Sequence, residues 1–346
     1  MEPAPRQTIA VQLRTLAVAA VGGLAFALVG VPGGYLSGAI LACAVAALAG
    51  LDARISQPMR NVALLMLGVV VGSTVTAETL EALPRWPLSL LALAVAMAAL
   101  VMVVPRYLSR MHGLDTPTAR LCAIPGAVSL VLALADELNV DERRVAVLQS
   151  LRLAILMMAV PLVVSLGVDL GDGGQAVEPL LSTPQLVALL GMAVAGFLIA
   201  RCFGVPAPAL TGAMLISGAL FASGTVGGRL PEPLVAAAFI VLGASVGARF
   251  AGIDRAYLAG CLGMSAGGIT LAVIITALIA WPAAAYLDLP FMQMWLAMAP
   301  GGFDTMVALA LALGVDPAFV AGHQLIRLLG LFLIVPFLFR GARRAP

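Results

Sequence analysis

Long, continuous apolar runs separated by short polar connections dominate the chain. The runs at 86–105 and 257–280 contain no charged residue, and about 20 apolar residues suffice for a helix to cross the hydrocarbon core of a bilayer. Because the runs are continuous and not alternating, they indicate helical spans and not the strands of a barrel. Charged residues make up only 10% of the chain, whereas a soluble domain has about 25%. We therefore expect an all-α, polytopic membrane protein.

The sequence repeats itself at a separation of about 175 residues. Pro32 recurs as Pro206 and Pro125 as Pro300. Further pairs in the same register are Gly38 with Gly212, Gly68 with Gly243, Asp141 with Asp316, Gln149 with Gln324 and Arg152 with Arg327. Such a register indicates an internal duplication. It predicts a first repeat at 1–168, an acidic, Gly-rich linker at 169–183 and a second repeat at 184–346.

Each repeat is expected to hold about five spans and one segment that is broken by a Pro-Gly pair. In the first repeat the spans are predicted at about 10–30, 35–50, 59–77, 86–105 and 143–167, with the broken segment at 116–138. In the second repeat they are predicted at about 184–202, 207–223, 233–250, 257–280 and 319–339, with the broken segment at 292–313.

The arginine residues indicate how the spans are oriented. If each broken segment is re-entrant, so that it turns back without crossing, nearly all arginines lie on one side and the Arg-free linker lies on the other. Arginine-rich loops face the cytoplasm, so we expect two inverted repeats with both termini cytoplasmic. A broken helix that crosses the membrane is the alternative. The Ala- and Arg-rich, Lys-free composition favours a bacterial protein, which we place in the inner membrane.

Each broken segment carries a Pro-Gly pair within an apolar run. Pro125 and Pro300 lack a backbone donor, while Gly126 and Gly301 tolerate the torsions of a sharp reversal. Irregular backbone at membrane depth occurs where it lines a cavity or packs inside protein. A helix that restarts after the break presents free N–H groups and a partial positive charge. The breaks therefore predict a site for an anionic substrate group, and a kink without a ligand is the alternative.

The polar residues that follow the two breaks differ. Gly302, Asp304 and Thr305 follow the second break, whereas Ser129 occupies the position of Asp304 in the first repeat. A carboxylate deep in a membrane is costly and usually functional, which predicts an ion-coupling role for Asp304. We assign substrate contacts to Gly302, Thr305 and Ser129. Asp near a helix start is also a common cap, so capping is a second interpretation that is compatible with the first.

Two Gln-Arg pairs at i, i+3 spacing each share one helix face. They are Gln149 with Arg152 and Gln324 with Arg327, and we assign all four residues to the substrate site. An Arg in a span costs on the order of 3 kcal/mol at the bilayer centre, so it needs a partner, for which Asp304 or a bound anion is a candidate. Snorkelling of the Arg to the interface is the alternative.

Other polar and small residues are expected to be structural. Asp141 and Asp316 have the position of N-caps for the next span, and His323, at the entrance of the last span, is expected to be a satisfied surface residue. Paired glycines at i, i+4 spacing are typical of close helix packing; they are Gly68 with Gly72, Gly243 with Gly247 and Gly263 with Gly267.

The chain lacks the sequence signatures of several function classes. The chain has no Walker-type Gly loop, no His-Glu-x-x-His and no Gly-x-Ser-x-Gly sequence, and its four Cys residues lack metal-type spacing. The basic residues are scattered, which leaves no footprint for nucleic acid. We therefore expect no enzyme activity, no cofactor, no metal site and no nucleic-acid partner.

The chain resembles the membrane AbrB family, whose members carry two AbrB-duplication repeats. The resemblance covers nearly the whole chain and is carried by the residues at 31–38, 124–126, 138–141, 299–304 and 322–327. Family members are labelled either as regulators of gene expression or as ammonia monooxygenases. Inverted five-span repeats with Gly-rich re-entrant loops are also similar to the glutamate and citrate secondary carriers, a likeness of architecture only.

Taken together, these features predict an inner-membrane protein with secondary-transporter-like architecture. It would move a small solute, for which an anion is the leading candidate, coupled to protons or sodium. Its expected partners are the lipid bilayer and the solute, and a homodimer is compatible with the sequence. One alternative is a membrane-embedded regulator that acts through a partner protein, and another is an ammonia monooxygenase, which needs bound copper or iron.

Overall fold

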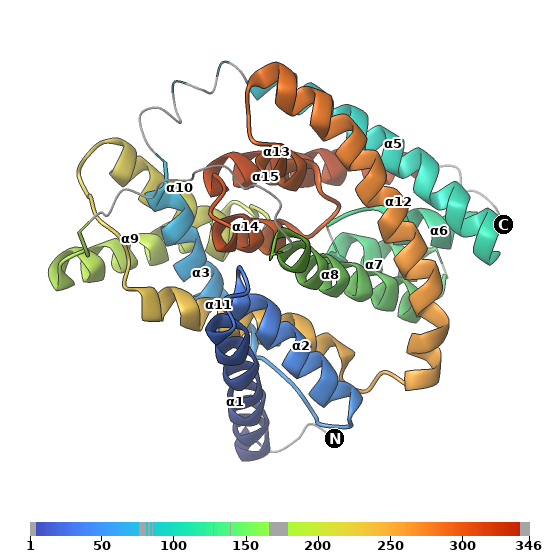
Figure 1. Ribbon diagram of the computed structural model, residues 1–346, viewed down its shortest axis with the longest axis horizontal. Helices are drawn as coiled ribbons and strands as arrows, with labels where there is room; N and C mark the ends of the chain where they lie inside the picture. The colour runs from blue at the N-terminus through green and yellow to red at the C-terminus, as the bar shows by residue number, and fades with distance from the viewer. Residues whose placement is uncertain are drawn as a thin grey trace. The chain divides into compact units, whose positions relative to one another are not determined.

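The computed structural model describes residues 5–75, 81, 84, 86–126, 128–138, 140–165 and 179–339, which excludes most of the predicted linker at 169–183. Apart from one backbone bridge between Leu180 and Arg229, the regular structure of these residues is helical (Figure 1). The chain divides into two compact units that each draw on both halves of the sequence. Unit 1 comprises Met1–Ala82, Leu156–Asp254 and Val307–Ala318, and unit 2 comprises Leu83–Ile155, Arg255–Met306 and Phe319–Pro346.

Unit 1 shows the same helix packing twice. Its helices are α1 (Pro5–Leu28), α2 (Gly34–Leu48), α3 (Gln57–Ser73), α9 (Thr183–Cys202), α10 (Pro208–Ala222), α11 (Glu232–Gly247) and the short 3-10 helix η2 (Ala248–Phe250). Helix α1 packs on α2 as α9 packs on α10, and α3 packs on α10 as α11 packs on α2. The duplicated sequence therefore makes duplicated contacts.

Glycines make the closest of these contacts possible. A Cβ atom at Gly68 would lie 2.5 Å from the carbonyl oxygen of Leu210, and one at Gly243 would lie 2.7 Å from that of Leu36. Leu36 and Leu210 are themselves counterparts in the two repeats. The predicted role of these glycines in close helix packing is confirmed, since any larger residue would push the backbones apart. In the third predicted pair Gly267 lies against the Tyr107 ring, but Gly263 has open space around it, so the prediction is wrong for Gly263.

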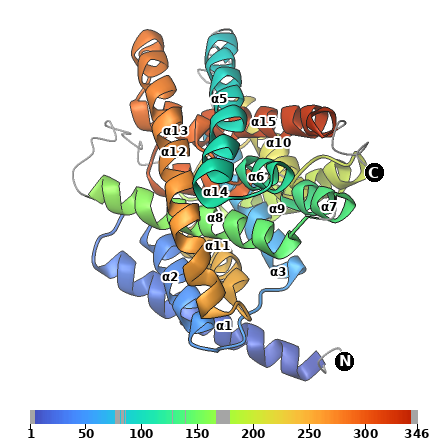
Figure 2. The same ribbon diagram turned by 90° about the vertical axis from the view of Figure 1, so that its right-hand side faces the viewer.

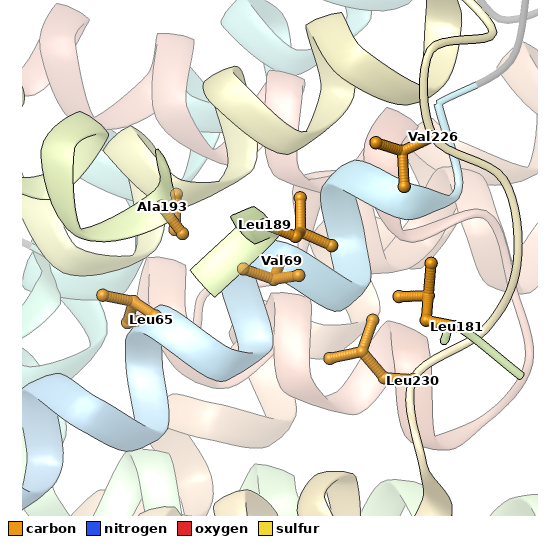
Figure 3. Packing of buried hydrophobic residues seen from close by; sticks show 8 residues of the cluster. Leu65, Val69, Leu181, Leu189, Ala193, Val226 and Leu230 are labelled. Carbon is orange, nitrogen blue, oxygen red and sulfur yellow. The ribbon is translucent and has the colours of Figure 1, made fainter. Parts of the chain in front are cut away.

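Apolar side chains close the core of unit 1 around α3 and α9. Leu65 and Val69 of α3 face Leu189 and Ala193 of α9 (Figure 3). The residues before α9 and after α10 complete the cluster with Leu181, Val226 and Leu230. Burial of a side chain of this size stabilises a fold by about 1.5–3 kcal/mol, so the cluster fixes α9 against α3.

Unit 2 contains the two broken segments. Its helices are α5 (Trp86–His112), α6 (Thr116–Ala123), α7 (Val128–Glu137), the first part of α8 (Glu142–Ser165), α12 (Arg255–Leu287), α13 (Phe291–Met298), the start of α14 (Phe303–Ala312) and α15 (Pro317–Leu338) from Phe319 onward. Helices α5 and α12 lie side by side (Figures 1 and 2). Asp141 accepts a hydrogen bond from the Arg144 amide at 2.9 Å, and Asp316 from the Ala318 amide at 2.9 Å, which confirms both predicted caps.

Seven of the described helices are long and apolar enough to cross a membrane, namely α1, α5, α8, α9, α11, α12 and α15. The shorter apolar helices include α2, α10 and α14. Each predicted span corresponds to a helix, and α5 and α12 extend several residues beyond their predicted ends. The helices at three predicted spans are shorter than the seven, since α2, α3 and α10 have 15, 17 and 15 residues. The helices thus support the expected all-α membrane protein.

Candidate functional site

Both predicted breaks are present, between α6 and α7 and between α13 and α14. The residue before each proline is extended, with φ −63° and ψ 119° for Ile124 and φ −56° and ψ 141° for Ala299. A proline ring disfavours the helical conformation of the residue before it. Gly126 adopts φ +82°, a region that residues with a side chain rarely occupy. The local sequence therefore ends each helix at the break.

In the first repeat, a Gln-Arg pair of α8 binds the carboxyl end of α6. The Gln149 Nε2 donates to the carbonyl oxygens of Leu121 at 3.1 Å and Ile124 at 3.0 Å. Arg152 donates from Nη1 to Cys122 O at 3.3 Å and from Nη2 to Ile124 O at 3.2 Å, and it also donates to Gln149 Oε1. The last carbonyls of a helix have no partner within that helix, so the pair satisfies them.

In the second repeat, the matching pair of α15 binds the carboxyl end of α13. The Gln324 Nε2 donates to Leu296 O at 2.7 Å. Arg327 donates from Nη1 to Ala299 O at 2.6 Å and from Nη2 to Gly301 O at 2.6 Å. The two repeats therefore use the same two side chains for the same purpose.

The sequence analysis did not predict that backbone carbonyl oxygens are the partners of the two arginines. Arg152 is 6% exposed and Arg327 is 4% exposed, so the burial of both side chains argues against snorkelling. A cation at the carboxyl end of a helix is favoured by the helix dipole, by up to about 2 kcal/mol. One signal in the sequence could have indicated that each Arg binds the break of its own repeat, because each Arg follows the proline of its break by the same interval.

The two breaks lie against each other within unit 2. A Cβ atom at Gly126 would lie 3.4 Å from Arg327 Nη2 and 3.8 Å from Gly301 O. Pro300 of the second break lines the same small cavity as Arg152, which binds the end of α6. Residues from both repeats thus form one site, which brings together most of the residues that the sequence analysis assigned to it.

The small cavity has a volume of about 30 Å³ and is also lined by Ser265 of α12. A cavity of about 10–15 Å³ already holds a water molecule. Arg152 Nε and Ser265 Oγ are buried without a hydrogen-bond partner in the protein, as are Arg327 Nε and Gln324 Oε1. Each unsatisfied group costs about 1–3 kcal/mol. Arg152 Nε and Ser265 Oγ belong to residues that line the cavity, so a water or a small ligand there would satisfy them. No pattern in the sequence singled out Ser265.

The polar residues after the second break lie at the start of α14. Asp304 is partly buried in the first turn of that helix. This position is compatible with both predicted roles of the residue, ion coupling and helix capping. Thr305 Oγ1 donates to Gly302 O at 2.9 Å. A Cβ atom at Gly302 would lie 3.0 Å from Asp304 Oδ1 and from Thr305 Oγ1, which explains the absence of a side chain there. The backbone of Ser129 lies at the matching position in α7, while its side chain is outside the described set.

His323 is not a surface residue, and that prediction is wrong. Its side chain is fully buried, with Nε2 2.7 Å from Ser89 Oγ and Nδ1 2.9 Å from Phe319 O. The rings of Trp86 and Phe319 lie against the imidazole, with centroids at 5.1 Å and 4.0 Å. The sequence did not show this burial because Ser89 and Trp86 come from α5, far away along the chain.

Comparison with known proteins gives matches along nearly the full length. The family model described as "Transition state regulatory protein AbrB" matches residues 35–343. A protein of Escherichia coli (strain K12) named "Putative regulator AbrB" is 28% identical over 333 residues, which cover 92% of each chain. "Uncharacterized protein YhjN" of Bacillus subtilis (strain 168) is 23% identical over an alignment of 355 residues, covering 94% of this chain and 91% of that protein. The chain therefore belongs to the AbrB family.

Proposed function

We propose that this protein is a secondary carrier that moves a small anion across the bacterial inner membrane, coupled to protons or sodium. One observation carries the proposal, the contact between two broken helices, one from each repeat, beside two buried arginines. Helical carriers bind their substrates where interrupted helices expose helix ends and freed carbonyls. The breaks of this chain have that form.

The charges at the site favour an anion. Arg152 and Arg327 are both buried and bound to neutral carbonyls, and the charge of one acts on the other. Arg152 Nε and Ser265 Oγ are donors at the small cavity that lack a partner, and a carboxylate or another small anion would accept from them.

The topology that fits this function is a pair of inverted repeats with re-entrant breaks and both termini in the cytoplasm. Helices of eight to ten residues, such as α6 and α7, are about 12–15 Å long. Each could reach the middle of a hydrocarbon core of about 30 Å from one side. A homodimer would be compatible with this arrangement.

Labelling of single cysteines in intact cells tests the topology. Met111 precedes α6 and Glu142 follows α7, and both are exposed. In a Cys-free background, Met111→Cys and Glu142→Cys should react with an impermeant reagent from the same side if the break is re-entrant. Reaction from opposite sides would show that the broken segment crosses the membrane.

Transport is tested in proteoliposomes with a panel of small carboxylates and imposed proton or sodium gradients. Ser265→Ala should raise the KM of the transported solute, while Ser245→Ala should not, because Ser245 donates to Leu242 of its own helix. Asp304→Asn should abolish gradient-driven uptake and leave solute exchange, while Asp136→Asn, an exposed acid of α7, should change neither. Folded protein without flux for any solute would contradict the proposal.

A second candidate function rests on the printed name of the Escherichia coli relative, which includes the word regulator. In that case the chain would act on gene expression through a partner protein. Affinity purification from membranes tests this candidate. A stable complex with a transcription factor or a sensor kinase, together with absent transport, would favour it over the carrier.

A further inference from the structure

A larger cavity lies between the last turns of α5 and α6, within unit 2. Its volume is about 570 Å³, inside the range of about 300–1,000 Å³ that small-molecule sites occupy. Its lining combines apolar and basic side chains and contains no acidic residue. The lining residues are Val101, Met102, Pro105, Arg106, Ser109, Arg110, Thr116, Arg120 and Ile124.

Three arginines from two helices converge on this cavity. Arg106 and Arg110 come from α5 and Arg120 from α6, and all three are exposed. Arg106 Nη1 donates to Met102 O of its own helix, but a guanidinium has five N–H donors, so it can still bind an anion. Asp115, next to the cavity in sequence, is engaged as the cap of α6 and accepts from the Thr118 amide at 3.0 Å. The lining is therefore strongly basic.

The cavity has a basic end and an apolar end, because its basic and apolar residues lie at different positions along α5. A helix of 27 residues is about 40 Å long, which exceeds a hydrocarbon core of about 30 Å. Arg106 and Arg110 lie within its last two turns, and Val101 and Met102 lie about one turn deeper. The basic end of the cavity would thus lie at the level of the lipid headgroups and the apolar end nearer to the hydrocarbon.

We propose that this cavity binds a phosphate-bearing anion, with the phosphate held by Arg106, Arg110 and Arg120. Forked guanidinium donors match phosphate oxygens, and Val101, Met102 and Ile124 would pack against an apolar part of the ligand. The phosphate has two conceivable sources, the headgroup of an anionic phospholipid or a free phosphate compound. The three arginines are not residues of the site at the breaks, and the proposal does not depend on a carrier function.

Ile124 connects the cavity to the first break. It lines the cavity, and its carbonyl oxygen accepts hydrogen bonds from Gln149 and Arg152. A ligand in the cavity would therefore contact the end of α6, which Gln149 and Arg152 hold by hydrogen bonds. Phosphate binding would then stabilise one position of the broken helix.

Calorimetric titration of the purified full-length protein in uncharged detergent tests the proposal. The probes are dihexanoyl-phosphatidylglycerol, dihexanoyl-phosphatidylcholine and inorganic phosphate. Arg106→Gln, Arg110→Gln and Arg120→Gln should each weaken binding of the anionic probe about fivefold, and the triple variant should weaken it about a hundredfold. Arg201→Gln is the matched control, because Arg201 is also an exposed Arg in the last turn of a long apolar helix but does not line the cavity.

The probes separate the two sources. Phosphatidylglycerol binding that the triple variant loses, without binding of inorganic phosphate, identifies a lipid headgroup. Binding of inorganic phosphate that the same variant loses identifies a free phosphate compound. The proposal is overturned if neither anion binds, if phosphatidylcholine binds as tightly as phosphatidylglycerol, or if the triple variant keeps the wild-type affinity. Should circular dichroism show that the triple variant is unfolded, unchanged affinity in each single variant overturns it.

Discussion

Replacement of Arg327 by Gln should destabilise the protein whether or not a ligand is bound. Arg327 donates to Ala299 O and Gly301 O at 2.6 Å each. A hydrogen bond from a charged donor contributes about 1.5–3 kcal/mol. Loss of the donor leaves Gly301 O unpaired, while Ala299 O keeps the Gly301 amide at 2.8 Å and Gln324 Nε2 at 3.4 Å as donors. We therefore expect Arg327→Gln to lower the free energy of unfolding by at least about 1.5–3 kcal/mol.

The geometry also predicts an order among variants. Arg152 makes the matching bonds at 3.3 Å and 3.2 Å, so Arg152→Gln should cost less than Arg327→Gln. Arg327→Lys should cost an intermediate amount, because an ammonium keeps the charge at the carboxyl end of α13 but lacks the planar fork that reaches two carbonyls.

Equilibrium unfolding in mixed micelles, followed by circular dichroism, measures these differences. Arg201→Gln serves as the control, since a substitution at an exposed position changes stability by less than about 0.5 kcal/mol. The role of Arg327 as a helix cap is refuted if Arg327→Gln unfolds like this control. A larger loss for Arg152→Gln than for Arg327→Gln would refute the order derived from the bond lengths.

Three further predictions concern helix packing, a buried histidine and a helix cap. Gly72→Ala places a Cβ 2.6 Å from a carbonyl oxygen of α10 and should cost at least about 1–3 kcal/mol in unfolding free energy, whereas Gly191→Ala, with open space around it, should not destabilise. Ser89→Ala removes the partner of His323 Nε2 and should lower stability by about 1–3 kcal/mol, and a Tm equal to that of the wild type would contradict this. Asp316→Ala removes the cap of α15 and should cost about 1 kcal/mol, measurable by the same unfolding assay.

The fold was predictable where the decisive signals are local. Apolar runs fix the spans, and the Pro-Gly pairs fix the breaks, because proline acts on the residue directly before it. Asp141 and Asp316 were predictable as caps for the same reason, since each binds an amide two or three residues away. The register of the duplication then placed each break in its repeat.

The parts of the site that escaped prediction depend on contacts between distant segments. Arg327 binds carbonyls that lie 26 and 28 residues earlier in the chain, and apart from the equal Pro-to-Arg interval of the two repeats the sequence does not indicate that partner. His323 is buried because Ser89, 234 residues away, packs against it. Ser265 lies in an apolar helix, and only the fold brings it to the cavity that Arg152 also lines. Burial and partners of this kind follow from packing and not from spacing.

The site has the same arginine cap at both breaks but an acidic residue at the start of the following helix in only one of them. Arg152 and Arg327 hold the ends of α6 and α13 in the same way, so the caps give both breaks the same support. Asp304 has only Ser129 as its counterpart, so a proton or a sodium ion can change the charge at one break and not at the other. Under the proposed function, coupling should therefore fall on the second repeat, while either repeat can contribute donors to the anion. The arginine caps explain why the breaks persist, and Asp304, which has no acidic counterpart in the first repeat, is where the proposed carrier would bind its coupling ion.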